Sequence, residues 1–373
     1  MGARERGRFG PRWECEMLSK VEPRPAARFC GRAPQVAVVG CGQWGRNIVR
    51  NLSELGALAG LVDRNAGSVA ALAARHGGSV MSFEQVLADP RIDAVAVAVP
   101  PAGHYRLAKA ALEAGKHVYV EKPLTLSVAH AEELCRIAEQ RDCRLMVGHI
   151  LQYHPGFLKL CDLVRDGLLG QLQYVSASRA NLGRICSEED IFWDLAPHDV
   201  SMILALMEDA PEAVDCIGGF YLNRAIADAT TIHLAFPGGR QAQVFVSWLY
   251  PFKEQKLVVV GDRGMAVFDD AAPWEQKLQL FAHRVELSGA LPVAHRAEPV
   301  SVIIDRAEPL RLELQHFLDC VASGATPRTD GYEATEVVRI LAEAHDKLRQ
   351  RHGDAPPMPV GLRPAQAPVL AAE

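Results

Sequence analysis

Residues 191–200, IFWDLAPHDV, place a carboxylate and an imidazole four positions apart, at Asp194 and His198. Side chains with this spacing lie one turn apart on a helix and can act on one ligand. An imidazole has an ordinary pKa of about 6.5, so it can take or give a proton near neutral pH. A structural role is also open, because Asp often caps a helix N-terminus and Pro197 suits a first helical turn. The segment alone does not decide between these two roles.

A glycine-rich turn follows the apolar run QVAVV and leads into a helical pattern. Its spacing is Gly40-x-Gly42-x-x-Gly45. Glycines at these positions allow a tight turn, close approach of a pyrophosphate to the backbone, and close packing of helix on strand. The helix N-terminus adds N–H groups that bind phosphate. We therefore expect a dinucleotide to bind here, in contact with Gln43 and Trp44 of the turn.

A second apolar segment, LAGLVDRN, ends in Asp63. This carboxylate follows the glycines at about the twenty-residue distance at which dinucleotide-binding folds place the residue that binds the adenosine ribose. It would accept hydrogen bonds from the ribose hydroxyls and repel a 2'-phosphate, which favours NAD. Arg64 leaves NADP open, because a guanidinium can stack on adenine or bind a 2'-phosphate.

The first half of the chain alternates strand-like and helical patterns. The segments AVAVAVPPAGHY, HVYVEKPL and RLMVGHI are strand-like, and each ends in polar or special residues. This rhythm predicts a doubly wound parallel sheet, in which ligands bind at the carboxyl ends of the strands. His104 could instead simply begin a helix. The candidate residues at the strand ends are Val99, Pro100, Pro101, His104, Glu121, Lys122 and His149.

The second half follows a different pattern. Strand-like segments succeed one another from AVDCIGGFYL to KLQLFAH, with short turns such as PGGR and GDRG. Such a succession predicts a mostly antiparallel sheet. We expect a dinucleotide-binding α/β domain over residues 33–150 and an α+β domain with a large open sheet over 151–353. Residues 1–32 and 354–373 read as loose tails, because they are rich in Pro, Arg or Ala.

The composition makes several classes of function improbable. The 373-residue chain has a formal net charge of -5, so it lacks the basic field expected of a nucleic-acid or membrane-surface partner. No apolar run approaches the roughly twenty residues of a membrane span. The nine cysteines have neither CxxC nor zinc-finger spacing. We therefore expect reduced thiols, a cytoplasmic protein and no metal site.

The motifs GCGQWG, VDRN, VAVPPAGHY and VEKPLT, together with DxxxH at Asp194 and His198, resemble those of the Gfo/Idh/MocA family of nicotinamide-dependent sugar and inositol oxidoreductases. The resemblance covers about residues 34 to 350. EKP followed at a distance by DxxxH is its most specific part. The segments NLG at residues 181–183, WDLAPHDVS and HFLDCVASGATPRTDG are similar to a branch that includes 3-dehydrogenases of UDP-N-acetylated sugars.

The resemblance implies a Rossmann domain followed by an α+β domain, and it assigns catalytic roles. His198 would exchange a proton with the sugar hydroxyl, Lys122 would steady the charge on that oxygen, and Asp194 would orient substrate and imidazole. It also implies that one face of the open sheet packs on helices. The other face would form a homo-oligomer, either a dimer or a tetramer.

A set of polar and aromatic side chains suits a large anionic ligand, because cations bind the diphosphate of a sugar nucleotide well. Trp248 is more readily explained by packing, and Lys253 could be a solvated turn residue. The candidate substrate-binding residues are His149, Arg179, Asn181, Trp193, Tyr250 and Lys253.

These observations favour an NAD-dependent dehydrogenase that oxidises a ring hydroxyl of a nucleotide-activated N-acetylated sugar to a ketone, in the synthesis of surface polysaccharide precursors. An inositol or free-sugar dehydrogenase and an NADPH-dependent ketosugar reductase would use the same residues. A non-catalytic NAD(P)-binding sensor or scaffold is an alternative of another class. The intact Lys122, Asp194 and His198 argue against it.

Overall fold

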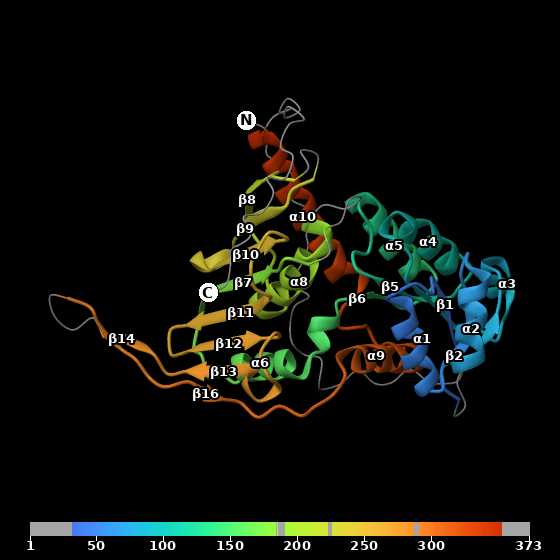
Figure 1. Ribbon diagram of the computed structural model, residues 1–373, viewed down its shortest axis with the longest axis horizontal. Coiled ribbons are helices and arrows are strands. Elements are labelled where there is room, and N and C mark those ends of the chain that lie inside the picture. The colour runs from blue at the N-terminus through green and yellow to red at the C-terminus, as the bar shows by residue number, and fades with distance from the viewer. Residues whose placement is uncertain (1–31, 184, 186–190, 223–225, 287–290, 353–373) are drawn as a thin grey trace, which may run out of the picture.

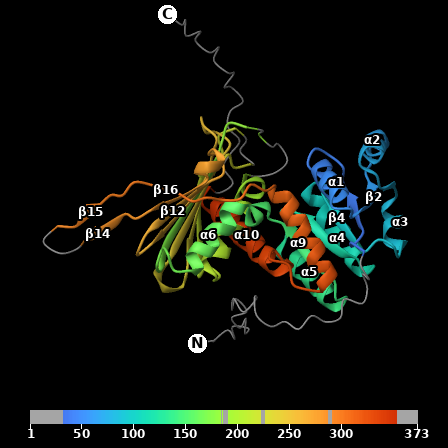
Figure 2. The same ribbon diagram turned by 90° about the horizontal axis from the view of Figure 1, so that it is seen from below.

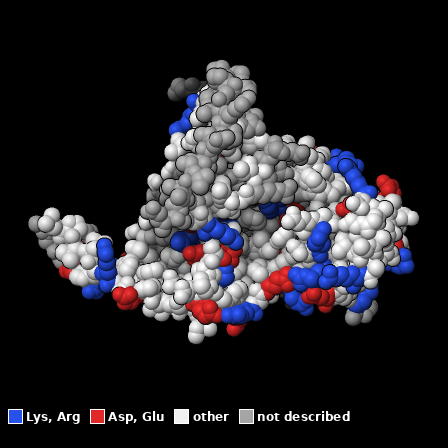
Figure 3. All heavy atoms as spheres, viewed as in Figure 1, with Lys and Arg blue, Asp and Glu red and all other residues white. Residues whose placement is uncertain are grey.

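The computed structural model describes residues 32–183, 185, 191–222, 226–286 and 291–352 (Figure 1). The two expected tails lie outside these residues, apart from Arg32. The described chain forms a six-stranded sheet, an eight-stranded sheet and a separate two-stranded hairpin. On the face seen in Figure 3, basic and acidic side chains are interspersed, and neither sign covers a large area.

The six-stranded sheet is parallel throughout and has the order β3-β2-β1-β4-β5-β6. β1, β4 and β6 are buried along their whole length, as required when helices cover both faces of a sheet. The prediction of a doubly wound parallel sheet is confirmed. The edge strand β3 has only two residues, Ser79 and Val80, and both are exposed, so no apolar run marks this strand in the sequence. The strands are β1 Val36–Val39, β2 Leu58–Val62, β3 Ser79–Val80, β4 Ala94–Val97, β5 His117–Glu121 and β6 Leu145–Gly148.

Helices connect these strands, and one helix from the end of the chain joins them. α9 packs on α1 (Figure 1), and its Leu314 and Phe317 are fully buried in one core cluster with Ile48 and Leu52 of α1. A segment distant in sequence therefore completes the core around the parallel sheet. The helices are α1 Gly45–Glu54, α2 Ala66–His76, α3 Phe83–Ala88, η1 Pro101–Gly103, α4 His104–Glu113, α5 Val128–Gln140 and α9 Pro309–Ser323.

The eight-stranded sheet has the order β16-β13-β12-β11-β7-β10-β9-β8. Its neighbours pair antiparallel except for β7 and β10, which run parallel. The prediction of a large, mostly antiparallel sheet is confirmed. The strands are β7 Leu172–Ala180, β8 Ala213–Gly219, β9 Ala229–Ala235, β10 Gln241–Ser247, β11 Glu254–Gly261, β12 Met265–Asp269, β13 Leu278–Phe281 and β16 Val300–Ser301.

Helices cover one face of the eight-stranded sheet and leave the other open (Figure 2). β10 shows the alternation that this requires, because Ala242, Val244 and Val246 are buried while Gln241 and Gln243 are exposed. The helices of this part are η2 Ile150–Tyr153, α6 Pro155–Arg165, α7 Ile191–Asp194, α8 Ala196–Met207, η3 Pro237–Gly239, η4 Trp274–Gln276 and α10 Gly331–His352.

A hairpin of β14 (Arg284–Glu286) and β15 (Val293–His295) forms its own small sheet. It projects away from the eight-stranded sheet on the side of the open face (Figure 2). Among the described residues, no helix combines the length and apolarity needed to cross a membrane. Five of the six cysteines in this part of the chain are buried, as expected of packing residues.

Candidate active site

The glycine turn between β1 and α1 has the shape that a dinucleotide needs. Gly40 has a φ of +96°, and a Cβ there would lie 2.5 Å from the carbonyl oxygen of Ala98. A Cβ on Gly45 would lie 1.9 Å from the oxygen of Gly40. A Cβ on Gly42 would meet nothing within 4 Å. Two glycines are thus required by packing, while the third leaves open backbone that a pyrophosphate can approach.

Asp63 follows β2 and turns its carboxylate towards the glycine turn. Oδ2 accepts a hydrogen bond from the N–H of Cys41 at 2.6 Å, and Oδ1 accepts one from the N–H of Asn65 at 2.8 Å. The remaining lone pairs of the carboxylate can accept bonds from hydroxyl groups. Arg64 beside it is exposed. The turn and the acid therefore fit the pyrophosphate and ribose of a bound dinucleotide.

Trp44 links this turn to the end of β5. Its indole Nε1 donates to Oε1 of Glu121 at 2.5 Å, and the Tyr119 hydroxyl reaches the same oxygen at 3.1 Å. Burial raises the pKa of Glu121. The sequence placed Trp44 and Glu121 among the cofactor-binding residues, but it gave no sign that they contact each other. Gln43 is exposed on the same turn.

His104 requires a correction, because its side chain does not line the open dinucleotide site. It is 1% exposed, and its ring nitrogens lie 2.8 Å from the carbonyl oxygen of Pro123 and 2.7 Å from that of Val99. α4 begins at His104. This histidine ties the loop after β4, which carries Pro100 and Pro101, to the loop after β5. The helix-start reading is the one that the structure supports.

Lys122 and Asp194 meet in space although 72 positions separate them. Lys122 follows β5, and its Nζ donates to the backbone oxygen of Asp194 at 2.5 Å. The same Nζ lies 3.8 Å from Oδ1 of that residue. Oδ2 accepts a hydrogen bond at 3.1 Å from the indole of Trp248, which is 1% exposed. Trp248 is therefore both a packing residue and a support for the Asp194 carboxylate, a role that the sequence did not reveal.

Asp194 does not cap the helix that carries His198. The N-cap position of α8 is Leu195, which makes no side-chain capping bond, while Pro197 lies in the first turn as expected. The carboxylate of Asp194 points instead to Trp248 and Lys122. Of the two roles left open by the sequence, this arrangement favours the one in which Asp194 acts with Lys122 and His198.

His198 lies in the first turn of α8, with part of its side chain accessible. Its Nδ1 is buried and lacks a hydrogen-bond partner in the described part of the chain, so Nε2 is the nitrogen that can meet a ligand. Burial, followed by the charges of Lys122 and Arg179, holds the pKa of His198 well below its usual value. The imidazole is therefore neutral at physiological pH and able to accept a proton.

Arg179 requires a second correction, because its guanidinium is already bound. Nε and Nη2 donate to the two carboxylate oxygens of Asp199 at 2.8 and 2.9 Å, and both side chains are buried. Such a desolvated pair is stable only with both partners present. Arg179 therefore fixes β7 to α8, beside His198, and is not available to a substrate diphosphate.

The other predicted substrate contacts are dispersed. The ring of Tyr250 packs against the rings of Phe245 and Phe252, and its assignment to the substrate site stays a prediction. Lys253 is exposed just before β11. Asn181 follows β7, where its N–H donates to Ser247. Trp193 is partly buried and packs between the core clusters of both sheets.

His149 is buried within electrostatic reach of Lys122 and His198. It follows β6 and is 2% exposed. Burial and the charge of Lys122 lower its pKa to about 3, and its Nε2 faces Oε2 of Glu333 at 3.6 Å. The sequence gave no signal for this contact, because Glu333 lies 184 positions after His149 in the chain.

The cluster at the edge of the parallel sheet can act on a hydroxyl group. It combines an ammonium, a carboxylate and a neutral imidazole, contributed by Lys122, Asp194 and His198. An ammonium stabilises negative charge that develops on oxygen, and a neutral imidazole accepts the proton. Lys122 follows the carboxyl end of β5, and the glycine turn follows that of β1, so both lie at the same edge of the sheet, where Lys122 contacts Asp194. The site thus unites proton transfer with a dinucleotide site.

Comparison with known proteins agrees with this geometry. Residues 35–149 match the oxidoreductase family model described as the NAD-binding Rossmann fold of Gfo/Idh/MocA proteins. Residues 157–267 match the model of the Gfo/Idh/MocA C-terminal domain. The chain belongs to the Gfo/Idh/MocA oxidoreductase family. The resemblance seen in the sequence is confirmed, and so is the expectation of an NAD-binding Rossmann domain.

Individual relatives cover most of the chain. It is 27% identical over 328 residues to a UDP-N-acetylglucosamine 3-dehydrogenase of Acidithiobacillus ferrooxidans, covering 83% of this chain and 97% of the relative. It is 32% identical over 262 residues to the oxidoreductase ORF334 of Rhizobium meliloti, covering 67% of this chain and 75% of the relative.

Solved structures show the same fold. The A. ferrooxidans enzyme GnnA matches with a TM-score of 0.75 at 24% identity over 85% of this chain and 97% of that chain. GenD2 from gentamicin A biosynthesis, solved in complex with NAD, matches with a TM-score of 0.71 at 24% identity over 84% of this chain and 94% of that chain.

Proposed function

We propose that this oxidoreductase is an NAD-dependent dehydrogenase that oxidises a ring hydroxyl of a nucleotide-activated N-acetylated sugar to a ketone. The observation that carries the proposal is the contact of Lys122 with Asp194 at the end of α7, four positions before the neutral His198 in the first turn of α8. The substrate class is supported by the UDP-N-acetylglucosamine 3-dehydrogenase that aligns over 97% of its own length. Cytoplasmic synthesis of surface polysaccharide precursors is the proposed setting.

The proposed reaction divides the work among three side chains. Nε2 of His198 removes the proton of the sugar hydroxyl. Nζ of Lys122 hydrogen-bonds that oxygen and stabilises its developing negative charge. The Asp194 carboxylate, held by Trp248, keeps Lys122 in place. Gly42, with its open backbone, and Asp63 would hold the dinucleotide, which when bound supplies the hydride acceptor.

A substrate panel tests the proposal. UDP-N-acetylglucosamine, its uronate, free N-acetylglucosamine, myo-inositol and glucose would each be offered with NAD and with NADP, and reduction of the nicotinamide followed by absorbance. We expect the UDP-sugars with NAD to give the highest kcat/KM. Preferred turnover of inositol or a free sugar would support an inositol or free-sugar dehydrogenase instead. Tight NAD binding without any turnover would favour a non-catalytic sensor.

Cofactor preference should follow Asp63. Its carboxylate accepts bonds from ribose hydroxyls and repels a 2'-phosphate, so the ratio of kcat/KM values should favour NAD. Replacing the acid in Asp63→Ser removes the repulsion and should move the ratio towards NADP. Arg64→Ala serves as the matched control, because it keeps the carboxylate and should leave NAD preferred. Equal or better kcat/KM with NADP in the wild type would refute the assignment.

We also propose a homo-oligomer, dimer or tetramer, formed through the open face of the eight-stranded sheet. Tyr174 and Ile217 on that face are 45% and 49% exposed, and Val285 and Val293 on the projecting hairpin are 60% and 49% exposed. Exposed apolar patches of this kind mark interfaces, and an isolated two-stranded hairpin is only marginally stable in water. Light scattering should give a multiple of 40.6 kDa, reduced by Tyr174→Lys. A monomer at micromolar concentration would contradict the proposal.

A further inference from the structure

A buried chain of hydrogen bonds runs from helix α9 to the glycine turn. The hydroxyl oxygen of Tyr119, on β5, lies 3.0 Å from Oε2 of Glu313 on α9 and 3.1 Å from Oε1 of Glu121 at the end of β5. The same Oε1 of Glu121 accepts the indole N–H of Trp44 at 2.5 Å. The side chains of Tyr119 and Glu313 are fully buried. Three segments that are distant in sequence therefore meet in one chain of hydrogen bonds.

Gly148, on the neighbouring strand β6, leaves the room that this chain occupies. It is the residue that pairs with Glu121 in the sheet. A Cβ on Gly148 would lie 2.6 Å from the hydroxyl oxygen of Tyr119 and 3.0 Å from Oε2 of Glu121. The φ of Gly148 lies outside the left-handed region, so the backbone does not require a glycine here. The missing side chain is explained by the polar groups that pack against this position.

One proton of this chain belongs to Glu313. Tyr119 has a single hydroxyl proton, yet carboxyl oxygens of two residues lie within hydrogen-bond distance of its oxygen, so one of these carboxyl groups must donate. Glu121 also accepts the Trp44 N–H and precedes the cationic Lys122, which favours its ionised form. Oε1 of Glu313 is buried without a hydrogen-bond partner among the described residues, a costly position for a charged oxygen. Glu313 therefore donates from Oε2 to Tyr119, and the proton of Tyr119 goes to Glu121.

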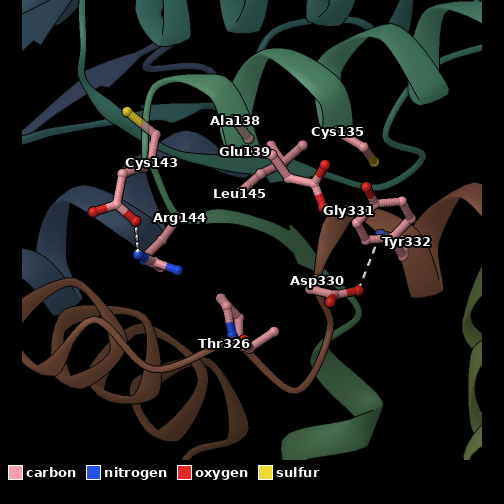
Figure 4. Close-up of a pocket in the computed structure, with 12 residues that line it drawn as sticks. Cys135, Ala138, Glu139, Cys143, Arg144, Leu145, Thr326, Asp330, Gly331 and Tyr332 are labelled. Atoms are coloured by element: carbon pink, nitrogen blue, oxygen red, sulfur yellow. Dashed lines mark hydrogen bonds and ion pairs between the residues drawn. The ribbon is translucent and has the colours of Figure 1, made fainter. Parts of the chain in front are cut away.

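Asp330, at the start of α10, shows a different arrangement of a carboxyl group. Its Oδ1 accepts hydrogen bonds from the backbone N–H groups of Tyr332 and Glu333 at 3.0 and 2.9 Å, the first of which is drawn in Figure 4. Backbone N–H groups always donate, so they suit a carboxylate. Glu313 contacts instead a phenol that a second carboxyl group also contacts. Burial, followed by the charge of Glu121, raises the pKa of Glu313 well above its usual value, in agreement with a proton on this residue.

We propose that Glu313 and Tyr119 are positioning residues of the dinucleotide site: protonated Glu313 directs the Tyr119 hydroxyl to Glu121, and Glu121 fixes the Trp44 indole for the bound dinucleotide. The bond between Trp44 and Glu121 joins the glycine turn after β1 to the end of β5, and β4 lies between these strands. Dinucleotides bind across this carboxyl edge of the sheet. The indole, 43% exposed, is thus held where the dinucleotide binds. The proposal rests on the dinucleotide part of the proposed function and not on its sugar substrate.

Titration of NAD into the protein without substrate tests the role in binding. Tyr119→Phe removes the hydroxyl at the centre of the chain and should raise the Kd for NAD about five- to tenfold, the effect of one hydrogen bond. Trp44→Phe should have a comparable effect. Because the chain acts through the indole, adding Tyr119→Phe to Trp44→Phe should change the Kd less than about twofold. Tyr153→Phe, at another buried tyrosine of the same core cluster, is the matched control and should leave the Kd unchanged. An unchanged Kd in Tyr119→Phe, or losses that multiply in the double variant, would overturn the proposal.

Two substitutions at Glu313 test where the proton lies. Gln has the shape of a protonated Glu and can donate to Tyr119 through its amide, whereas Leu has no donor. Glu313→Leu should raise the Kd for NAD about fivefold, and Glu313→Gln should restore the affinity. Equal losses in the two variants would overturn the assignment of the proton, because an ionised Glu313 is replaced no better by Gln than by Leu.

Fluorine NMR of protein labelled with fluorotryptophan follows Trp44 without any ligand, and Trp44→Phe identifies the signal of this residue. The signal should shift in Tyr119→Phe and in Glu313→Leu. It should keep its position in Tyr153→Phe and in Glu313→Gln. A signal that stays in place in every variant would overturn the proposal. Thermal melting shows which variants fold, and the two Glu313 variants decide the outcome if Tyr119→Phe does not fold. Absence of sugar turnover would contradict the proposed function and would leave the NAD titrations and the NMR signals as tests of this chain.

Discussion

Replacing His198 with alanine is expected to lower kcat by about 10²- to 10⁴-fold, the usual contribution of a positioned acid or base. NAD affinity should be unchanged, because the glycine turn and Asp63 lie on other elements. The side chain is partly accessible and its Nδ1 has no hydrogen-bond partner among the described residues, so the melting temperature should change little. Steady-state kinetics, dinucleotide titration and thermal melting measure the three quantities.

The pH dependence follows from the same residue. The pKa of His198 is held well below its usual value, so the imidazole stays neutral, and wild-type kcat should not fall as the pH drops through about 6.5, the ordinary histidine value. Lys122→Ala should lose a comparable factor. Both groups act on one oxygen in one transition state, so the double variant should fall little below the worse single variant. Wild-type turnover by His198→Ala would show that the DxxxH interpretation is wrong.

Removing the nucleotide from the substrate is expected to lower kcat/KM by several orders of magnitude. Binding energy from parts of a substrate remote from the reacting carbon stabilises the transition state when the enzyme uses it for positioning. N-acetylglucosamine, its 1-phosphate and UDP-N-acetylglucosamine form a graded series for this measurement. UDP alone, tested as a competitive inhibitor, is the matched control and should bind.

Equal kcat/KM across that series would contradict the sugar-nucleotide proposal. The guanidinium of Arg179 is bound to Asp199, so the variant Arg179→Ala should not act through the nucleotide. It leaves Asp199 buried without its cation, which should destabilise the protein. A loss of stability with every substrate affected alike is therefore the expected result for that variant.

The parts of the fold that were predictable depend on local sequence. Buried parallel strands read as apolar runs, and the glycines of the first turn are dictated by backbone geometry, which explains why β1, β4 and the turn at Gly40 were found. The pair Asp194 and His198 was visible because their spacing matches one helical turn. The order of the antiparallel strands could not be predicted, because pairing depends on contacts between distant segments.

Arg179 and Glu333 show where prediction from local sequence fails. Arg179 looked like an anion ligand, because nothing in β7 reveals that Asp199 on α8 neutralises it. Glu333 reaches Gln152 across 181 positions, a contact that no spacing rule encodes.

The proposed function requires a hydride to move from a sugar-ring carbon of a UDP-N-acetylated hexose to NAD. The most direct measurement uses UDP-N-acetylglucosamine deuterated at carbon 3, incubated with NAD and enzyme, followed by mass spectrometry of the dinucleotide. We expect one deuterium in each NADH formed, and no labelled NADH with His198→Ala within the same time. Absence of both reduction and label with this substrate, while inositol or a free sugar reduces NAD, would contradict it.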